Sequence, residues 1–289
     1  MNYSALIQNR KSVRSFTDKK VPLYTMAELR SYFQSGVKRL IPGIKTELRI
    51  FGDDAKQALE GAAGYNQFLV GAPQYLVLLT EKHPQAHLNA GFIMQDLVLK
   101  LTDMEYDSCW VTFTDSQLVK QALEIVSDLD VAAIVAYGIG VKATKRLRIN
   151  IRSMSNIDIS AKRHYFEPKK SISDLVFLEK WGNREGVNQH IGFFDDILWE
   201  ALYAVSHSPS YLNRQAYAFV LKKDGHVILV RRPDAYNTEL DSQLSLGIAL
   251  LHFTAVAEEK TAGVNWSFGP EAAQLDLPEG CEVVASCVV

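Results

Sequence analysis

Short apolar runs alternate in the first half of the chain with longer stretches in which apolar residues recur every three or four positions. The runs over 75–79 and 132–137 predict buried strands, and the periodic stretch over 89–104 predicts a long helix between them. Weaker patterns predict helices over 3–9, 26–35, 55–63 and 115–124, and a short strand within 40–52. The first half is therefore expected to be α/β in character.

The second half shows the same alternation. Strands are expected over 175–178, 217–221, 226–230 and 281–286, and helices over 193–205 and from Gly247 onward. Asp224-Gly225 predicts a hairpin turn between the second and third of these strands. Between the halves, residues 142–170 are rich in charge and poor in period, so we expect a long connection there.

Two segments of the chain resemble each other. Gly91 and Gly247 each open an apolar-periodic stretch that is expected to continue as a helix to a tryptophan, Trp110 or Trp266, nineteen residues later. An apolar strand is predicted before and after each helix. This ordered series predicts an internal duplication.

Composition restricts the class of protein. A chain of 289 residues that is 47% hydrophobic and 22% charged can bury a sizeable core, which excludes disordered and fibrous proteins. The net charge of −2 provides no overall field for nucleic acid or an anionic membrane, so neither is expected as a partner.

Cysteine usage and the N-terminus bear on the compartment. The three cysteines, Cys109, Cys281 and Cys287, lack metal-ligand spacing, and Cys109 is expected at the end of an apolar helix. A reduced, cytoplasmic chain is expected rather than a disulfide scaffold. No signal peptide is recognised at the N-terminus, and no apolar run approaches the roughly 20 residues of a membrane span.

A basic motif, Arg10-Lys11-Ser12-Val13-Arg14-Ser15-Phe16, follows the first predicted helix. Arg10 and Arg14 are four residues apart, so on a helix they would share one face. Two guanidinium groups with the Ser12 hydroxyl could hold several oxygens of a phosphomonoester. The alternative is an ordinary solvated basic helix face.

A polar turn, Ser208-Pro209-Ser210-Tyr211-Leu212-Asn213-Arg214-Gln215, precedes the predicted strand 217–221. Pro209 fixes its own φ, and Ser210 and Asn213 favour turns, so polar groups are presented where the strand begins. The alternative is a turn in which Asn213 only satisfies local backbone groups. Together the two motifs are expected to form two walls of a nucleotide-shaped cleft.

These two motifs resemble those of the FMN-dependent nitroreductase family. The segment from Arg10 to Arg14 is similar to the family's N-terminal phosphate-binding motif, and Pro209 to Gln215 is similar to its Pro-Ser-x-x-Asn-x-Gln flavin loop. Further similarity covers Asn66, the strand after Gly71-Ala72-Pro73, the helix from Gly91, and the basic segment from Lys169 to Leu175. In ordinary members the loop follows soon after the basic motif, and two subunits share each FMN site. Here the loop lies in the second half, which resembles a subgroup in which one chain forms a built-in pseudo-dimer.

The resemblance implies an α+β fold of α/β-like, three-layer type, a nitroreductase-like fold made of two tandem half-domains. Residues 1–170 would carry the phosphate-binding motif and residues 171–289 the flavin loop. The second half has no counterpart of Arg10 to Arg14, so one chain should hold one flavin. A monomer is expected, with a homodimer as the alternative.

The resemblance also implies roles for individual residues. Arg10 and Arg14 would hold the phosphate with help from Lys169 or Arg163, and Asn66 and Asn213 would bond polar edges of the ring or the ribityl chain. The expected cofactor-binding residues are Arg10, Lys11, Ser12, Arg14, Asn66, Lys169, Pro209, Ser210, Tyr211, Asn213 and Gln215. No catalytic acid or base is required, because flavin supplies the reactive centre. Tyr211 departs from the smaller residue that family members often have, so it would either stack on the substrate or block it.

Two functions follow as hypotheses. The first is an FMN-dependent oxidoreductase that uses NADH or NADPH to reduce small-molecule acceptors, nitroaromatic or quinone-like. The second is a flavin-binding protein without such turnover, a sensor, store or chaperone, in which Tyr211 closes the acceptor face.

Three other patterns have weaker functional interpretations. Gly138-Ile139-Gly140 resembles a dinucleotide fingerprint and would suggest a nicotinamide dehydrogenase, but residues 145–151 alternate like a strand where that site needs a helix. The seven histidines form no metal-ligand set, and His252 is expected in the core. Asp195-Asp196 is expected to begin a helix rather than to act in catalysis.

Overall fold

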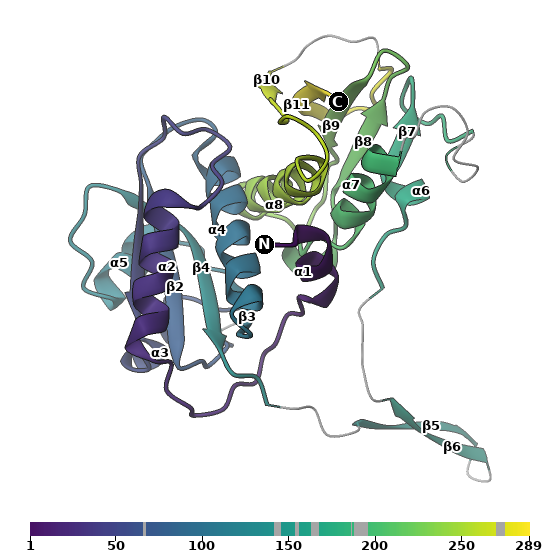
Figure 1. The fold of residues 1–289 in the computed structure, drawn as a ribbon. Helices are drawn as coiled ribbons and strands as arrows, with labels where there is room; N and C mark the ends of the chain where they lie inside the picture. Colours follow the sequence, from purple (N-terminus) through teal and green to yellow (C-terminus); the bar gives the residue numbers. More distant parts are fainter. Residues whose placement is uncertain are drawn as a thin grey trace.

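The computed structural model describes residues 1–65, 68–141, 146–153, 156–162, 168–185, 187, 196–269 and 275–289. Two sheets, one from each half of the chain, lie on opposite sides of a central pair of long helices, α4 (Ala86–Asp103) and α8 (Glu239–Ala257) (Figure 1). The contact between these two helices joins the two lobes of the molecule.

The first sheet is antiparallel throughout, in the order β1-β2-β4-β3. Its strands are β1 (Thr46–Phe51), β2 (Gln74–Thr80), β4 (Asp130–Gly138) and β3 (Asp107–Val111). Leu76 and Leu78 of β2 pack toward α4 and α2 (Leu23–Ser35), whereas Tyr75 and Val77 pack toward α3 (Asp54–Leu59) and α5 (Ser116–Ala122). Both faces of the sheet are covered, which explains why β2 is a continuous apolar run rather than an alternating one.

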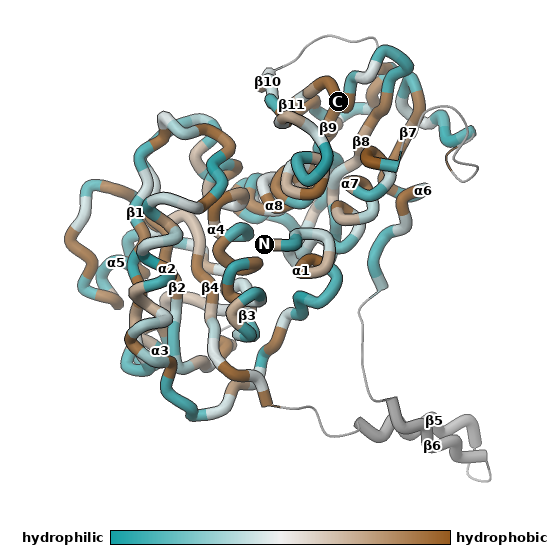
Figure 2. The backbone as a smooth tube through the Cα atoms, in the orientation of Figure 1, coloured by the Kyte–Doolittle hydropathy of each residue, from teal (hydrophilic) through white to brown (hydrophobic). Residues whose placement is uncertain are grey.

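The second sheet has the order β10-β11-β9-β8-β7. Its strands are β10 (Ser267–Phe268), β11 (Glu282–Val288), β9 (His226–Arg231), β8 (Tyr217–Leu221) and β7 (Val176–Leu178), and only the β7–β8 pair is parallel among these described strands. Phe219 and Leu229 pack in the cluster formed with α7 (Asp196–Ser206) and α8. The apolar colouring of β8 in Figure 2 matches its burial.

Five short elements complete the described fold: α1 (Tyr3–Asn9), β5 (Arg146–Ser153), β6 (Asn156–Lys162), α6 (Ile172–Leu175) and the 3₁₀ turn η2 (Tyr211–Asn213). Strands β5 and β6 pair antiparallel with each other. The plain connection expected over 142–170 is therefore wrong in part. The alternation of apolar Leu147, Ile149 and Ile151 with polar residues was the signal for a strand in this region.

Helices α4 and α8 cross at two glycines. A Cβ atom on Gly91 would lie 2.4 Å from the carbonyl oxygen of Leu244, and one on Gly247 would lie 2.0 Å from that of Leu88. Leu88 and Gly91 are each 156 residues before Leu244 and Gly247, so the two contacts are equivalent in the two repeats. Only glycine permits backbones to approach this closely, and the reciprocal contact supports the internal duplication.

The expected nineteen-residue helices ending at tryptophan are wrong. Helix α4 ends at Asp103, where the turn includes Glu105 at a φ of 64°, and Trp110 lies in β3. Cys109 is accordingly a strand residue rather than the end of a helix. Helix α8 ends at Ala257, and Trp266 precedes β10. Periodicity identified the helices but not their ends, because buried strands continue the apolar pattern beyond the turns.

Helix α8 is long and apolar enough to cross a membrane by length and composition alone. Within the protein, 89% of that apolar segment is buried, as in the core helix of a folded domain. The boundary between residues 170 and 171 stays a prediction. It lies between the last strand of the first sheet, β4, and the first strand of the second sheet, β7.

Gly247→Ala should destabilise the protein strongly, because the new methyl group would overlap the Leu88 carbonyl and force the two helices apart. We expect the free energy of unfolding to fall by at least about 2–3 kcal/mol. Urea denaturation followed by circular dichroism would measure this change. Gly43→Ala is the control, since its Cβ would meet nothing within 4 Å. Equal stability of the two variants would contradict the close crossing.

Candidate functional site

The basic motif is extended rather than helical. Helix α1 ends at Asn9, and Arg10 has a φ of −60° and a ψ of 131°. Ser12 forms a β-bridge with Ser108, and the Val13 N–H donates to the Ser108 carbonyl at 2.9 Å. The helical face expected for Arg10 and Arg14 is therefore wrong, because this segment pairs with the edge of β3 instead. Residues four apart also lie on the same side of an extended chain. Burial raises the pKa of the Cys109 thiol, and the charges of both arginines oppose this rise.

Arg10 carries a buried charge. The residue keeps some exposed surface, but its Nε is enclosed and has no hydrogen-bond partner among the described residues. One terminal nitrogen donates to Ser12 Oγ at 3.2 Å. Burial lowers the pKa of Arg10 to about 10. No described carboxylate forms an ion pair with Arg10, so this guanidinium group suits an anionic ligand.

The polar turn is held in an unusual backbone conformation. Leu212, Asn213 and Gln215 have φ angles of 47°, 56° and 43°, in the left-handed region that residues other than glycine rarely adopt. The Gln215 N–H donates to Ser210 Oγ at 2.9 Å, and the Gln215 side-chain amide donates to the Ser206 carbonyl at 2.9 Å. Strained backbone of this kind is concentrated at ligand sites, where the surrounding structure maintains it.

The segment Pro168 to Lys170 is attached to this turn. Lys169 Nζ donates to the Ser208 carbonyl at 3.0 Å and to Asn213 Oδ1 at 2.5 Å. Asn213 Nδ2 donates to the Pro168 carbonyl at 2.8 Å, and the Lys170 N–H donates to Gln215 Oε1 at 2.8 Å. The Ser208 hydroxyl is buried without a partner among the described atoms. The structure thus bonds Lys169 to the loop, whereas the sequence indicated it only as a helper of Arg10 and Arg14 in holding the phosphate.

Positive charges of the basic motif and of the segment bonded to the turn act on His252 of α8. This buried side chain lies close enough to Arg10, Lys169 and His207 for their positive charges to lower its pKa. Burial is the larger cause, and the pKa of His252 falls to about 3. His252 is a core residue, as expected. The effect of Arg10 and Lys169 on the pKa of His252 is an observation that sequence reasoning missed.

A chain of hydrogen bonds fixes the state of His252 and joins the two halves. Trp110 Nε1 can only donate, so Gln95 Oε1 accepts its bond at 3.1 Å. Gln95 Nε2 then donates to His252 Nε2 at 2.9 Å. This leaves His252 Nδ1 to donate to the Ala204 carbonyl at 2.9 Å. His252 is therefore neutral, with its proton on Nδ1.

Asp96 is the counterpart of His252, 156 residues earlier on α4. Its carboxylate is buried and accepts hydrogen bonds from Tyr3 Oη at 2.9 Å, Tyr32 Oη at 2.8 Å and the Lys38 N–H at 2.8 Å. Burial raises the pKa of Asp96, although these three bonds oppose the rise. The two repeats therefore carry an acid and a base at equivalent places. Only the His252 side has Arg10 and Lys169 beside it.

Two tyrosines meet where the halves face each other near the loop. The Tyr211 ring lies edge to face with that of Tyr65, with centroids 6.3 Å apart. The Tyr211 N–H donates to Ser245 Oγ of α8 at 3.3 Å. Asn66 and Arg163, both expected to help bind the cofactor, lie outside the described residues.

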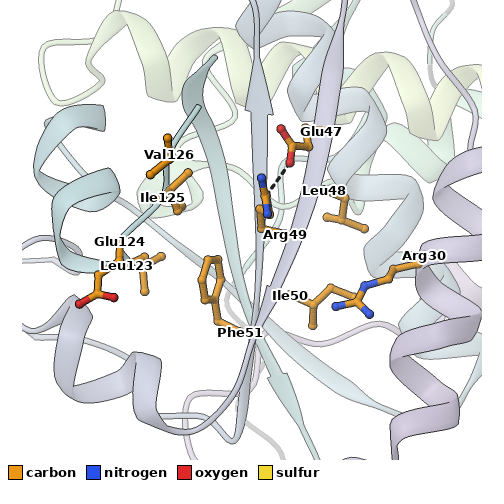
Figure 3. A pocket seen from close by; sticks show the side chains of 10 residues that line it. All are labelled: Arg30, Glu47, Leu48, Arg49, Ile50, Phe51, Leu123, Glu124, Ile125 and Val126. Atoms are coloured by element: carbon orange, nitrogen blue, oxygen red, sulfur yellow. Dashed lines mark ion pairs between the residues drawn. The ribbon is translucent and has the colours of Figure 1, made fainter. Parts of the chain in front are cut away.

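Other candidate sites receive no support from the described residues. A cavity of about 620 Å³ is lined by β1, Arg30 of α2 and residues 123–126, and it contains none of the residues expected to bind the cofactor (Figure 3). The Gly140 N–H donates to Asp107 Oδ2 at 3.0 Å, and strand β5 begins at Arg146. Among the described residues, no group of His, Cys, Asp or Glu could hold a metal ion.

Comparison with known families decides the identity. A model of the family described as "Putative TM nitroreductase" matches residues 2–179, more than half of the chain. The chain belongs to this nitroreductase family. Family membership confirms the family resemblance, over a stretch that includes the basic motif but not the loop from Pro209 to Gln215, and makes the protein an oxidoreductase by class.

Solved structures extend the comparison. A Thermotoga maritima protein described as "a putative nitroreductase" is 19% identical, with a TM-score of 0.59, and the match covers 100% of this chain and 94% of that one. A Clostridium novyi nitroreductase family protein is 17% identical over 49% of this chain and 86% of that one, with a TM-score of 0.43. A Clostridium difficile protein described as an FMN-dependent nitroreductase is 17% identical over 48% and 88%, with a TM-score of 0.43. No curated protein matches significantly. The first match confirms the α+β, nitroreductase-like fold over the full chain.

Acid should destabilise the protein through His252. Between pH 6.5 and about 3 the unfolded histidine binds a proton that the folded one cannot, so its contribution to stability is lost as the pH falls. The wild type should lose up to about 1.4 kcal/mol per pH unit more than His252→Gln over this interval. Urea denaturation of both proteins between pH 7 and about 4 would measure the difference. Parallel curves would contradict a buried neutral His252.

Proposed function

We propose that this nitroreductase family member is an FMN-dependent oxidoreductase that takes a hydride from NADH or NADPH. Its acceptors would be nitroaromatic or quinone-like small molecules. One observation carries the proposal: Arg10, whose Nε is enclosed without a described partner, and Lys169, which is bonded to the strained turn, are both near enough for their charges to lower the pKa of His252.

The phosphate of FMN fits this cluster. Arg10, Ser12 and Arg14 come from the basic motif and Lys169 from the segment bonded to the flavin loop, so a phosphate held by them would compensate a buried positive charge. Lys11 is the further basic residue of the motif. Asp96 at the equivalent place in the other repeat would repel a phosphate, which supports one flavin per chain.

The flavin loop would contribute Pro209, Ser210, Tyr211 and Asn213, with Asn66 from the first half. Gln215 has a different role from the expected lining of the ring. Its side chain is fully buried, its amide oxygen accepts from the Lys170 N–H, and its amide nitrogen donates to the Ser206 carbonyl. We therefore assign Gln215 the task of holding the loop in its left-handed conformation.

Bound FMN would supply the ring nitrogen N5 that accepts and gives up the hydride. The protein's residues would bind the phosphate, orient the ring and shape the face on which donor and acceptor alternate. Both walls of the site come from one chain, so a monomer would suffice for activity, and we propose that the enzyme acts in the cytoplasm.

The visible spectrum of the purified protein is the first test. A flavin spectrum, release of FMN on denaturation, and rapid bleaching by NADH or NADPH without oxygen are the expected results. A colourless protein that cannot take up added FMN would contradict the proposed site.

A second candidate function is a flavin-binding protein without turnover. The contact between Tyr65 and Tyr211 favours it, because two rings that meet across the halves could close the face on which an acceptor would stack. This function predicts bound FMN that nicotinamide bleaches slowly or not at all.

Arg10→Gln should weaken FMN binding, because the buried guanidinium group would no longer bond the phosphate. A hydrogen bond to a charged group is worth about 1.5–3 kcal/mol, so we expect about a 10- to 100-fold rise in the dissociation constant. Fluorescence titration of the apoprotein with FMN would measure it. Arg30→Gln, an exposed arginine of the same half, is the control and should bind normally. Unchanged affinity in Arg10→Gln would exclude the phosphate role.

Tyr211→Ala should open the acceptor face. With the Tyr65 contact removed, we expect KM for a bulky quinone to fall by about threefold, while the rate of flavin reduction by nicotinamide stays the same. Steady-state and anaerobic stopped-flow kinetics would separate the two quantities. Tyr236→Phe, a substitution that keeps an exposed ring in place, serves as the control. A higher KM in Tyr211→Ala would show instead that Tyr211 stacks on the acceptor.

A further inference from the structure

A second cavity, of about 430 Å³, lies beside the flavin loop and is lined by the described residues Pro168 to Lys170, Asp174, Leu212 to Arg214, and Asp234. Its lining includes the cationic residues Lys169, Lys170 and Arg214, together with Asn213 of the loop. Its size is within the range of small-molecule sites, and larger than a single inorganic ion requires.

The acidic residues that line this cavity are already bonded locally. Asp234 Oδ2 accepts from Arg214 Nε at 2.7 Å, and its Oδ1 accepts from the Tyr236 N–H at 3.0 Å. Asp174 Oδ2 accepts from the N–H and hydroxyl of Ser171, at 3.1 and 2.7 Å, in the cap of α6. Among the described lining residues, the three cationic side chains outnumber these two carboxylates.

Positive charge is crowded around Lys170. Its ammonium group donates to the Gln215 carbonyl at 2.9 Å, and burial, followed by the charges of Arg232 and Arg214, lowers its pKa. Arg232 itself is half-buried, and its guanidinium carbon lies 5.5 and 5.2 Å from the ring centroids of Phe177 and Trp181, which pack against each other. An anion in the cavity would relieve this repulsion.

Arg214 is arranged to recognise more than charge. Its guanidinium group lies over the Tyr236 ring at 4.9 Å, and Tyr236 is 65% exposed. Arginine stacked on an exposed aromatic ring provides a planar surface next to its hydrogen-bond donors. That combination suits a base that carries a phosphate close by.

We propose that this cavity binds the 2′-phosphate of NADPH and makes the enzyme prefer NADPH to NADH. The inference rests on the proposed function. The ligand chemistry is a phosphomonoester, which carries a charge of about −1.5 to −2 at neutral pH and pairs well with arginine and lysine. The cavity shares Asn213 and Lys169 with the flavin loop, so a donor whose nicotinamide reaches the flavin can extend its other end into it. NADH lacks this phosphate and would bring no such negative charge to a lining in which the described cationic side chains outnumber the acidic ones.

Arg214→Gln tests the proposal in the FMN-loaded protein. Glutamine keeps a donor for Asp234 but removes the charge, so kcat/KM for NADPH should fall at least about tenfold, while kcat/KM for NADH changes less than about twofold. Arg231→Gln is the matched control, since Arg231 also pairs with an acid, Glu239 at 2.7 Å, but does not line the cavity. Equal losses for the two nucleotides, or none, would overturn the assignment. A loss of bound FMN in Arg214→Gln would also overturn it, because the cavity would then serve the phosphate of FMN.

Direct binding measurements test this inference independently of the proposed function. Calorimetry with 2′-AMP, 5′-AMP and inorganic phosphate needs no flavin and no turnover. Tighter binding of 2′-AMP than of the other two, lost in Arg214→Gln and kept in Arg231→Gln, would support the site even in a protein that fails to reduce acceptors. Equal binding of inorganic phosphate and 2′-AMP would reveal a site for free phosphate and overturn the nucleotide assignment. Absence of binding by all three would overturn the cavity as an anion site, whatever the fate of the FMN proposal.

Discussion

The close crossing of α4 and α8 is the constraint on which the rest of the structure depends. Gly91 and Gly247 let two backbones approach until each helix touches a carbonyl of the other. This crossing holds one sheet on each side, and it brings Gln95 of one half within hydrogen-bond distance of His252 of the other. The candidate cleft is therefore a consequence of helix packing, because its walls belong to lobes that meet through these helices.

Around this contact, local bonds determine where the functional groups lie. Pairing with the edge of β3 straightens the basic motif and directs Arg10 and Arg14 toward Cys109. In the second half, Lys169 and Gln215 tie the turn to the segment before α6. Neither motif lies on a long helix or strand. Each is an irregular segment fixed by bonds to a rigid neighbour, which is a common arrangement for binding sites.

The sequence predicted the fold class, most strands, and both motifs, since apolar runs and turn residues report burial directly. It failed where tertiary pairing overrides local pattern. Arg10 and Arg14 have helical spacing, but β3 pairs with their backbone and keeps it extended. The apolar pattern continues across a turn to Trp110, so the predicted helix was too long. The meeting of Arg10 with His252 could not be derived, because the two residues are far apart in sequence and only the helix crossing joins them. The available signal for these buried positions was the presence of polar residues, Asp96 and His252, on helices that are otherwise apolar.

Asp96 and His252 show what a fused chain permits. In a dimer of identical subunits, every substitution appears twice, so both copies of a shared site must carry the same charge. Here equivalent positions on α4 and α8 carry opposite chemistry: a carboxylate that accepts three hydrogen bonds, and a neutral imidazole beside two cations. One interface thus has a hydrogen-bonded carboxylate on one side and, on the other, a neutral histidine near the proposed ligand site. Because the two repeats belong to one chain, equivalent positions can carry different residues, and the two sides of the interface can differ in their chemistry.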